Sequence, residues 1–383
     1  MVTTVNDTRQ LLRETRDRVV PPSDVLGALD RRRRHDTQVR RATAAVLGII
    51  VAAAGLGGWF AVRGDDSDRT AGQDEELGIF APVAGWIFYA NDPSGGARIR
   101  AVDPASTGEY PTTVQVTSQT GTPMGWSSDG TVLLIRRLED GNTQQLIILH
   151  ADGTETELVR RSWIGGASIS PDGSRVAYMS YGNEGDGEPR GLYLVDADGG
   201  PSVLLAEASR AVLDGPTFWL LDEPIFSPDG TQIAYVEAVG ERAQSENRVW
   251  IVNADGSGAH VIVENEVTLE PGLIAGLAWS PTGDRIAMGV ARDSDSGKYY
   301  YDPFGTGVDA GIYTFSPDGS RFSLVIEGGV SPTWSPDGSR IAFEGLRRDG
   351  NQPSRFMIAD ADGSDRHDLS LPAVGPGLWH PGS

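Results

Sequence analysis

WSPDGSRIAFEG, residues 334–345, contains a tight turn followed by a run of alternating apolar and polar side chains. Proline presets φ for the turn, aspartate supports the turn with side-chain hydrogen bonds, and glycine supplies the positive φ. The alternating run is typical of a half-buried strand, so the stretch predicts a β-hairpin. The pattern recurs as WSSDGTVLLIRR (126–137), ISPDGSRVAYMS (169–180), FSPDGTQIAYVE (226–237) and WSPTGDRIAMGV (279–290).

A second hairpin follows each motif at a variable distance. Four copies have an A-D-G turn, namely LIILHADGTETELV (146–159), LYLVDADGGPSVLL (192–205), VWIVNADGSGAHVIV (249–263) and FMIADADGSDRHDL (356–369). In the remaining unit IYTFSPDGSRFSLVI (312–326) takes this place, because Ser316 and Ser335 lie only 19 residues apart, too few for a whole unit. Each unit is therefore predicted to contain four antiparallel strands, a to d, with two tight turns.

The spacing of the units predicts a closed ring. First-turn motifs begin at positions 127, 170, 227, 280 and 335, and four-stranded units of this length are typical propeller blades. GWIFYAND (85–92) resembles a strand b without a preceding hairpin, and GPGLWHPGS (375–383) resembles a strand a with no strand b after it. Joined, the two ends make a sixth blade and leave no open sheet edge. We therefore expect an all-β, six-bladed propeller of four-stranded antiparallel blades.

The recurring S-P-D-G-x-x-I-A signature resembles the WD40-like repeats of the TolB family, whose propeller has six blades. The resemblance covers residues 78–383 and implies a protein-binding periplasmic scaffold. The chain departs from the family pattern in two ways, because no separate N-terminal α/β domain is evident and a predicted membrane anchor replaces the secretion signal. The family's partner, a peptidoglycan-associated lipoprotein, is therefore not carried over to this chain.

Residues 42–62, ATAAVLGIIVAAAGLGGWFAV, are uncharged and long enough for a helix to cross the hydrocarbon layer. Arginines precede the segment (Arg31–Arg34, Arg40, Arg41) and aspartates follow it, so the positive-inside rule places the N-terminus in the cytoplasm. A cleaved signal peptide is the competing interpretation, but its charged and apolar regions would be unusually long. The sequence predicts a single-pass bacterial membrane protein: a cytoplasmic arginine-rich tail (1–41), a transmembrane helix (42–62), an acidic linker (63–77) and an extracytoplasmic propeller (78–383).

Charge is distributed unevenly between these parts. Residues 1–41 carry ten arginines and six acidic residues, whereas the rest of the chain carries 22 basic and 47 acidic residues. Because an acidic body repels phosphate backbones, the propeller is not expected to bind nucleic acid.

No catalytic, cofactor-binding or metal-binding residue is predicted. The chain lacks cysteine, its five histidines are isolated in the sequence, and no nucleophile elbow, metalloprotease motif or phosphate loop occurs. Asp293–Gly297 resembles only part of a calcium-binding loop. The aromatic residue before each first turn is expected to fill the gap between neighbouring sheets, and the turn aspartates are expected to form turns.

Topology separates the two faces of the ring. The tight a–b and c–d turns lie on one face, and the long insertions of the b–c and d–a connections lie on the other. Two insertions are apolar for exposed loops, which is typical of interaction sites. The candidate partner-binding residues are therefore Phe218, Trp219, Tyr299, Tyr300, Tyr301 and Phe304.

The leading hypothesis is a membrane-anchored interaction module that binds an extracytoplasmic protein, peptide or wall-associated ligand. The alternative is a one-pass signalling protein whose cytoplasmic tail binds a regulator, in an anti-sigma-like manner, under control of the propeller. An enzyme is the third and least favoured hypothesis, because propellers of serine peptidases carry a separate hydrolase domain that is not found here.

Overall fold

A computed structural model describes residues 77–90, 98–106, 111–139, 143–181, 189–207, 224–239, 246–263, 272–293, 299–300, 310–346, 355–372 and 377–382. The chain divides into two compact units, Met1–Asp68 and Arg69–Ser383, and all of these residues belong to the second unit. Within them, no helix is long and apolar enough to cross a membrane. The predicted tail and transmembrane segment (1–62) lie outside the described residues and stay predictions.

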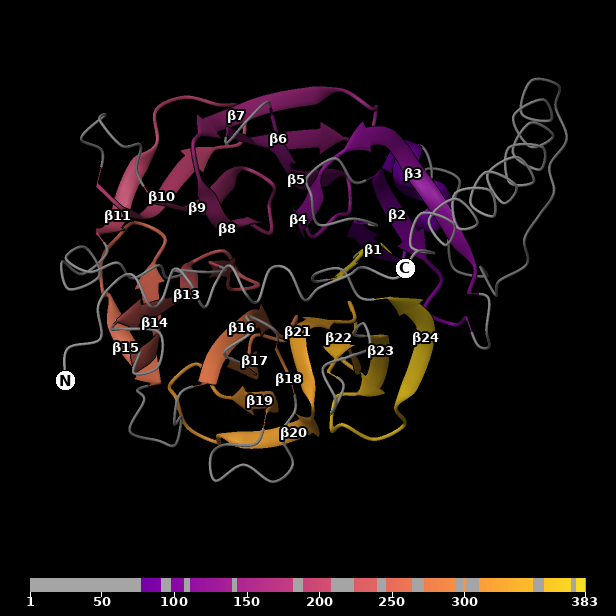
Figure 1. Ribbon diagram of the computed structural model, residues 1–383. Helices are drawn as coiled ribbons and strands as arrows, with labels where there is room; N and C mark the ends of the chain where they lie inside the picture. Colours follow the sequence, from indigo (N-terminus) through magenta and orange to yellow (C-terminus); the bar gives the residue numbers. More distant parts are fainter. Residues whose placement is uncertain are drawn as a thin grey trace, which may run out of the picture. The chain divides into compact units, whose positions relative to one another are not determined.

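The described strands form six antiparallel sheets, which stand around a common axis as the blades of a propeller (Figure 1). Blade 1 contains β25 (Leu378–Trp379), β1 (Ile87–Ala90), β2 (Arg98–Val102) and β3 (Thr113–Thr120). Blade 2 contains β4 (Thr122–Trp126), β5 (Val132–Leu138), β6 (Gln144–His150) and β7 (Glu155–Arg161). Blade 3 contains β8 (Ile164–Ile169), β9 (Arg175–Ser180), β10 (Gly191–Asp196) and β11 (Val203–Glu207).

The remaining blades follow the same strand order. Blade 4 contains β12 (Ile225–Phe226), β13 (Gln232–Val239), β14 (Glu246–Asn253) and β15 (His260–Val263). Blade 5 contains β16 (Gly272–Trp279), β17 (Ile286–Asp293), β19 (Gly311–Phe315) and β20 (Ser323–Glu327), with β18 (Tyr299–Tyr300) paired to β17. Blade 6 contains β21 (Gly329–Trp334), β22 (Arg340–Gly345), β23 (Arg355–Asp360) and β24 (His367–Pro372). The predicted six blades of four antiparallel strands are confirmed.

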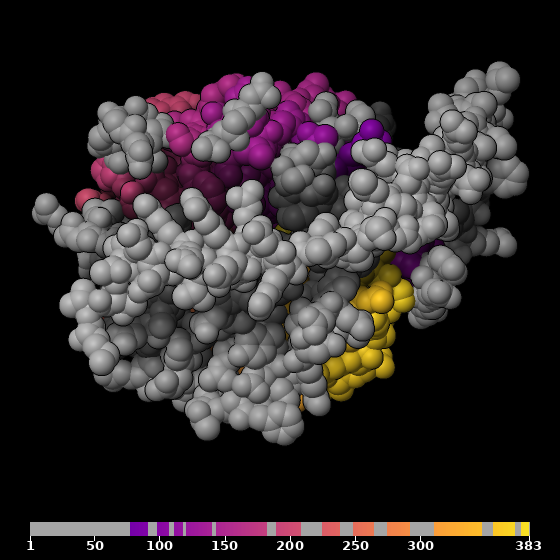
Figure 2. All heavy atoms as spheres, viewed as in Figure 1, coloured from indigo at the N-terminus to yellow at the C-terminus, as the bar shows by residue number. Residues whose placement is uncertain are grey.

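The hydrophobic core is divided into six clusters, one at each interface between neighbouring blades. Strand alternation explains this arrangement, since Ile341 and Phe343 of β22 face blade 5 while Ala342 between them faces blade 1. The aromatic residues before the first turns belong to these clusters, as Phe226, Trp334 and Trp379 show with exposed fractions of 6–7%. Side chains of blades 2 and 3, in magenta, form one continuous surface along the upper edge of Figure 2.

The ring closes by pairing the two ends of the domain. Trp379 of β25 lies opposite Ile87 of β1, the same register that joins Trp334 to Ile341 within the continuous hairpin of blade 6. The backbone N–H of His380 donates to the Trp86 carbonyl at 2.8 Å, as the Ser335 N–H donates to Arg340 at 2.9 Å. The predicted sixth blade, built from both ends, is therefore confirmed, and its closure is non-covalent.

Candidate binding site on the propeller axis

The first turns of blades 2–6 are each stabilised by a small hydrogen-bond network that follows from the turn sequence. In blade 6 the Ser335 hydroxyl donates to Asp337 Oδ1 at 2.6 Å, and Ser335 Oγ accepts the backbone N–H of Arg340 at 2.9 Å. The same aspartate oxygen accepts the N–H of Ser339, and Gly338 adopts a φ of 71°. Blades 3 and 4 repeat these contacts. The expectation that the aspartates form the turns is confirmed.

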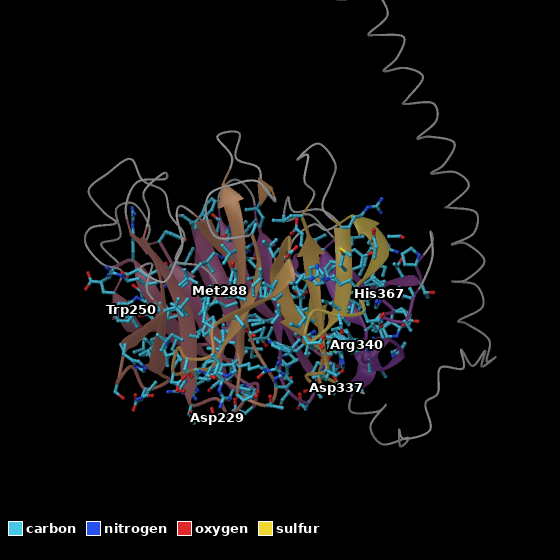
Figure 3. The ribbon with its side chains drawn as sticks, turned by 90° about the horizontal axis from the view of Figure 1, so that it is seen from below. Asp229, Trp250, Met288, Asp337, Arg340 and His367 are labelled. Atoms are coloured by element: carbon cyan, nitrogen blue, oxygen red, sulfur yellow. The ribbon has the colours of Figure 1, made fainter. Side chains whose placement is uncertain are left out.

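These networks keep the turn carboxylates ionised. The hydrogen bond from the Ser170 hydroxyl, with those from the backbone and hydroxyl of Ser174, lowers the pKa of Asp172 to about 2. Hydrogen bonds from Ser227 and Thr231 lower the pKa of Asp229 in the same way. Figure 3 shows Asp229 and Asp337, from two different blades, at the same edge of the propeller. The tight-turn face therefore carries ionised aspartates from several blades.

The first turns converge on a cavity of about 420 Å³ at the propeller axis. Aromatic or aliphatic side chains and turn prolines from all six blades line it: Trp126, Ser127, Ser128, Ile169, Pro171, Phe226, Pro228, Ala278, Trp279, Pro281, Thr333, Trp334, Ser335, Pro336, Leu378, Trp379 and Pro381. No ionisable side chain is among these lining residues. The cavity lining is thus uncharged, with apolar side chains beside serine and threonine hydroxyls, and ionised aspartates follow three of its prolines directly in the sequence.

Neighbouring blades hold the cavity walls in place. The Trp334 indole N–H donates to the Ala278 carbonyl of blade 5 at 3.2 Å, and the Arg285 guanidinium lies 4.9 Å from the Trp334 ring centroid. Arg340 stacks on Trp379 in the same manner, at 5.1 Å. An arginine of the preceding blade thus covers the ring of each of these two tryptophans.

The cavity lining combines aromatic and proline side chains with hydroxyl groups. Its polar side-chain groups are serine and threonine hydroxyls and tryptophan indole N–H groups. Within the described residues no group of three or more acidic or histidine side chains is positioned to hold a metal ion. His150, His260, His367 and His380 lie on four different blades. A volume of this size, with rigid aromatic walls, suits an apolar side chain or the tip of a loop.

The candidate residues predicted from the sequence were assigned to the face opposite the tight turns. Phe218, Trp219, Tyr301 and Phe304 lie outside the described residues. Tyr299 and Tyr300 form β18, which pairs with Asp293 and Arg292 at the end of β17. Their proposed role in partner binding stays a prediction.

The axial cavity was missed at the sequence level. The Trp-Ser-Pro pattern of the repeats could have indicated this cavity, but the tryptophans were assigned only to packing between blades. In the structure these tryptophans pack between blades and also line the cavity. Trp334, for example, belongs to the interface cluster of blades 5 and 6 and is a lining residue of the cavity.

No protein family and no curated protein matches this chain by sequence. Among solved structures, TolB from Acinetobacter baumannii is 15% identical and superimposes with a TM-score of 0.52 over 79% of this chain and 67% of that one. A chain of the nidogen/laminin complex is 10% identical, with a TM-score of 0.53 over 77% of this chain and 98% of that one. A protein described as TolB from Agrobacterium tumefaciens is 18% identical, with a TM-score of 0.49 over 78% and 95%.

At these levels of identity the likeness concerns the fold alone. The described part of the chain is a six-bladed β-propeller of four-stranded blades, with a fold similar to that of TolB from Acinetobacter baumannii.

Proposed function

We propose that this protein is a membrane-anchored, extracytoplasmic interaction module and that its axial cavity receives an apolar side chain or loop tip of a partner protein or peptide. The observation that carries the proposal is the cavity of about 420 Å³, to which all six blades contribute and whose lining has no ionisable group. Burying an apolar group there removes it from water at roughly 25 cal/mol per Å². Aromatic walls held by neighbouring blades lose little entropy when the ligand binds.

The negative charges of the turn aspartates restrict the kind of partner surface that can bind at the cavity. The pKa values of Asp172, Asp229 and Asp337 are lowered by hydrogen bonds within the turns, so these carboxylates are ionised near the cavity at neutral pH. A strongly acidic partner surface would be repelled at short range, whereas a neutral or basic surface would not. Nucleic acid is disfavoured for the same reason.

Membrane anchoring is supported by the sequence. The uncharged segment 42–62 follows six arginines and precedes an acidic stretch, a combination typical of a single span with a cytoplasmic N-terminus. We place the propeller outside the cytoplasmic membrane on this ground. The arginine-rich tail also supports the signalling alternative, in which the tail binds a cytoplasmic regulator.

A pull-down from solubilised membranes tests the site. The Thr333→Arg variant places a long charged side chain in the cavity, and the double variant Trp219→Ala, Tyr300→Ala removes two aromatic rings from the insertion-bearing face. We expect the first variant to lose the partner captured by the wild type and the second to keep it, with melting temperatures close to that of the wild type. Loss of binding only in the second variant would place the site on the insertion-bearing face. Unchanged binding in both variants would contradict the proposed site.

A further inference from the structure

The residue that closes each first turn lies five positions after the turn serine, and in blades 2–6 its backbone N–H donates to the hydroxyl oxygen of that serine. This residue is an arginine in blades 3, 5 and 6, namely Arg175, Arg285 and Arg340. Blade 4 has Gln232 and blade 2 has Val132 at the same position. The repeats therefore differ in charge at a position that their hydrogen bonds make structurally equivalent.

Arg285 of blade 5 is held between its own turn and the next blade. Its guanidinium lies 4.9 Å from the ring centroid of Trp334 in blade 6. Its Nε lies 3.8 Å from Oδ2 of Asp284, the aspartate of the same turn. Stacking on the indole and attraction to the carboxylate stabilise the same position of the guanidinium.

Arg340 of blade 6 repeats both interactions. Its guanidinium lies 5.1 Å from the ring centroid of Trp379 in blade 1. Hydrogen bonds from Ser335 and Ser339 lower the pKa of the turn aspartate Asp337, and the charge of Arg340 lowers this pKa further. Two blades therefore bind a guanidinium group between a turn carboxylate and the indole of the following blade.

The junction of blades 4 and 5 has the carboxylate and the indole but not the arginine. Trp279 of blade 5 is partly exposed and lines the axial cavity together with Pro228, which precedes Asp229. Asp229 is exposed, and hydrogen bonds from the turn hydroxyls and backbone lower its pKa. Gln232, which takes the place of the arginine, is uncharged.

The turns of blades 4 and 5 approach each other as those of blades 5 and 6 do. A Cβ added to Gly283 of blade 5 would lie 4.0 Å from Pro228 Cγ of blade 4. A Cβ added to Gly338 of blade 6 would lie 3.4 Å from Pro281 Cγ of blade 5. The arrangement that holds Arg285 is therefore matched in backbone at the junction of blades 4 and 5.

The indole of Trp279 is less enclosed than that of its counterpart Trp334. Trp334 is 6% exposed and donates its indole N–H to a carbonyl of the preceding blade. Trp279 keeps partial exposure and donates its indole N–H to the Gly283 carbonyl of its own turn, at 3.2 Å. The ring of Trp279 is thus accessible from the cavity.

We propose that the rim of the axial cavity between blades 4 and 5 binds an arginine side chain of the partner, with its guanidinium stacked on Trp279 and paired with Asp229. The partner supplies there the group that the chain itself supplies in blades 5 and 6. This subsite rests on the proposed function, because Trp279 lines the cavity that receives the partner. A guanidinium suits the site better than an ammonium group, since it is planar, stacks on an indole and forms directed hydrogen bonds with a carboxylate.

A titration with a small molecule tests the subsite before the partner is known. The probe is N-acetylarginine amide, added to the full-length protein in detergent micelles with 5-fluorotryptophan in place of tryptophan. The fluorine resonance of Trp279 is assigned by its loss in Trp279→Phe. We expect this resonance to shift saturably, with binding about fivefold weaker for the uncharged isostere N-acetylcitrulline amide. Equal binding of both compounds, or no shift of this resonance, would overturn the proposal.

Variants of blade 4 locate the probe. Asp229→Asn should weaken its binding about fivefold, whereas Asp255→Asn, in the c–d turn of the same blade, should leave the affinity close to that of the wild type. Gln232→Arg introduces the arginine of the other repeats, so its own guanidinium should occupy the site and abolish the shift. The matched variant Gln232→Met should bind the probe as the wild type does. Wild-type probe binding in Gln232→Arg would contradict the proposal.

The pull-down separates this subsite from the proposed function. Gln232→Arg should lower partner capture about fivefold, and Thr333→Arg should abolish it. Loss of capture in Thr333→Arg with full capture in Gln232→Arg would overturn the arginine subsite and leave the proposed function intact. Full capture in both variants would instead contradict docking of the partner in the cavity, and with it the proposed function.

Discussion

Deleting residues 378–383 removes the innermost strand of blade 1, and the structure allows the cost to be calculated. Trp379 is 7% exposed, and truncation of a buried tryptophan costs about 3–5 kcal/mol. Three hydrogen bonds are lost as well, from Trp379 Nε1 to Gly85, from the His380 N–H to Trp86 and from His380 Nε2 to Gly130. At about 1 kcal/mol each, they bring the loss to about 6–8 kcal/mol, a large share of a typical folding free energy.

Thermal unfolding followed by circular dichroism measures this loss. We expect the melting temperature to drop by about 10 °C or more, or the protein to aggregate, because the edges of β1 and of the blade 1–2 interface become exposed. A matched variant that lacks only Ser383 controls for the change of terminus. If the shorter chain melts at the same temperature as the control, the closure carries little stability and this account of the ring is wrong.

Three further predictions follow from the turns and from the chain topology. Gly363→Ala should lower the melting temperature by several degrees more than Gly199→Ala. Both glycines have positive φ, but only a Cβ at position 363 would lie 1.8 Å from the Val325 carbonyl oxygen of blade 5. Equal effects of the two substitutions would show that blade 5 moves to accommodate the methyl group. Ser170→Ala should bring the pKa of Asp172 back toward its usual range and lower the free energy of unfolding at pH 7. The stabilisation that comes from the lowered pKa is present above pH 4 and is lost as pH falls toward 2. The difference between variant and wild type in urea unfolding should therefore shrink in acid. Protease added to intact spheroplasts should digest the chain beyond about residue 64 and spare the arginine-rich tail, whereas digestion of the tail alone would reverse the predicted topology.

The repeated turn motif made most of the fold predictable. Its proline, aspartate and glycine have local physical roles, so the a–b and c–d hairpins could be located without knowledge of the tertiary structure. Ring closure was also predictable, since GWIFYAND and GPGLWHPGS each lack the strand that the other supplies. In both cases the information is local in the sequence or repeated along it.

The axial cavity could not be predicted in this way. It depends on how closely six first turns approach the axis, a quantity set by the packing of neighbouring blades. Residues at equivalent sequence positions also differ, because Trp334 and Trp379 are buried whereas Trp126 and Trp279 keep partial exposure. His380 is a similar case, since the sequence shows a histidine in place of serine but not its contact with Gly130, 250 residues away.

The short strand β18 is a third feature that could not be predicted from the sequence. The segment that contains Tyr299 and Tyr300 was interpreted as a long insertion, yet these two residues pair with β17 of blade 5. Two residues are too few to give a periodic pattern, so this pairing depends on the neighbouring strand rather than on the local sequence.

Site-specific photo-crosslinking in living cells tests the central claim most directly. A photoreactive amino acid is placed at Thr333, in the axial cavity, or at Tyr300 of β18, in the full-length protein. We predict a discrete adduct of higher mass after irradiation with the probe at position 333 and none with the probe at position 300. An adduct only from position 300 would contradict the assignment of the axial cavity as the binding site.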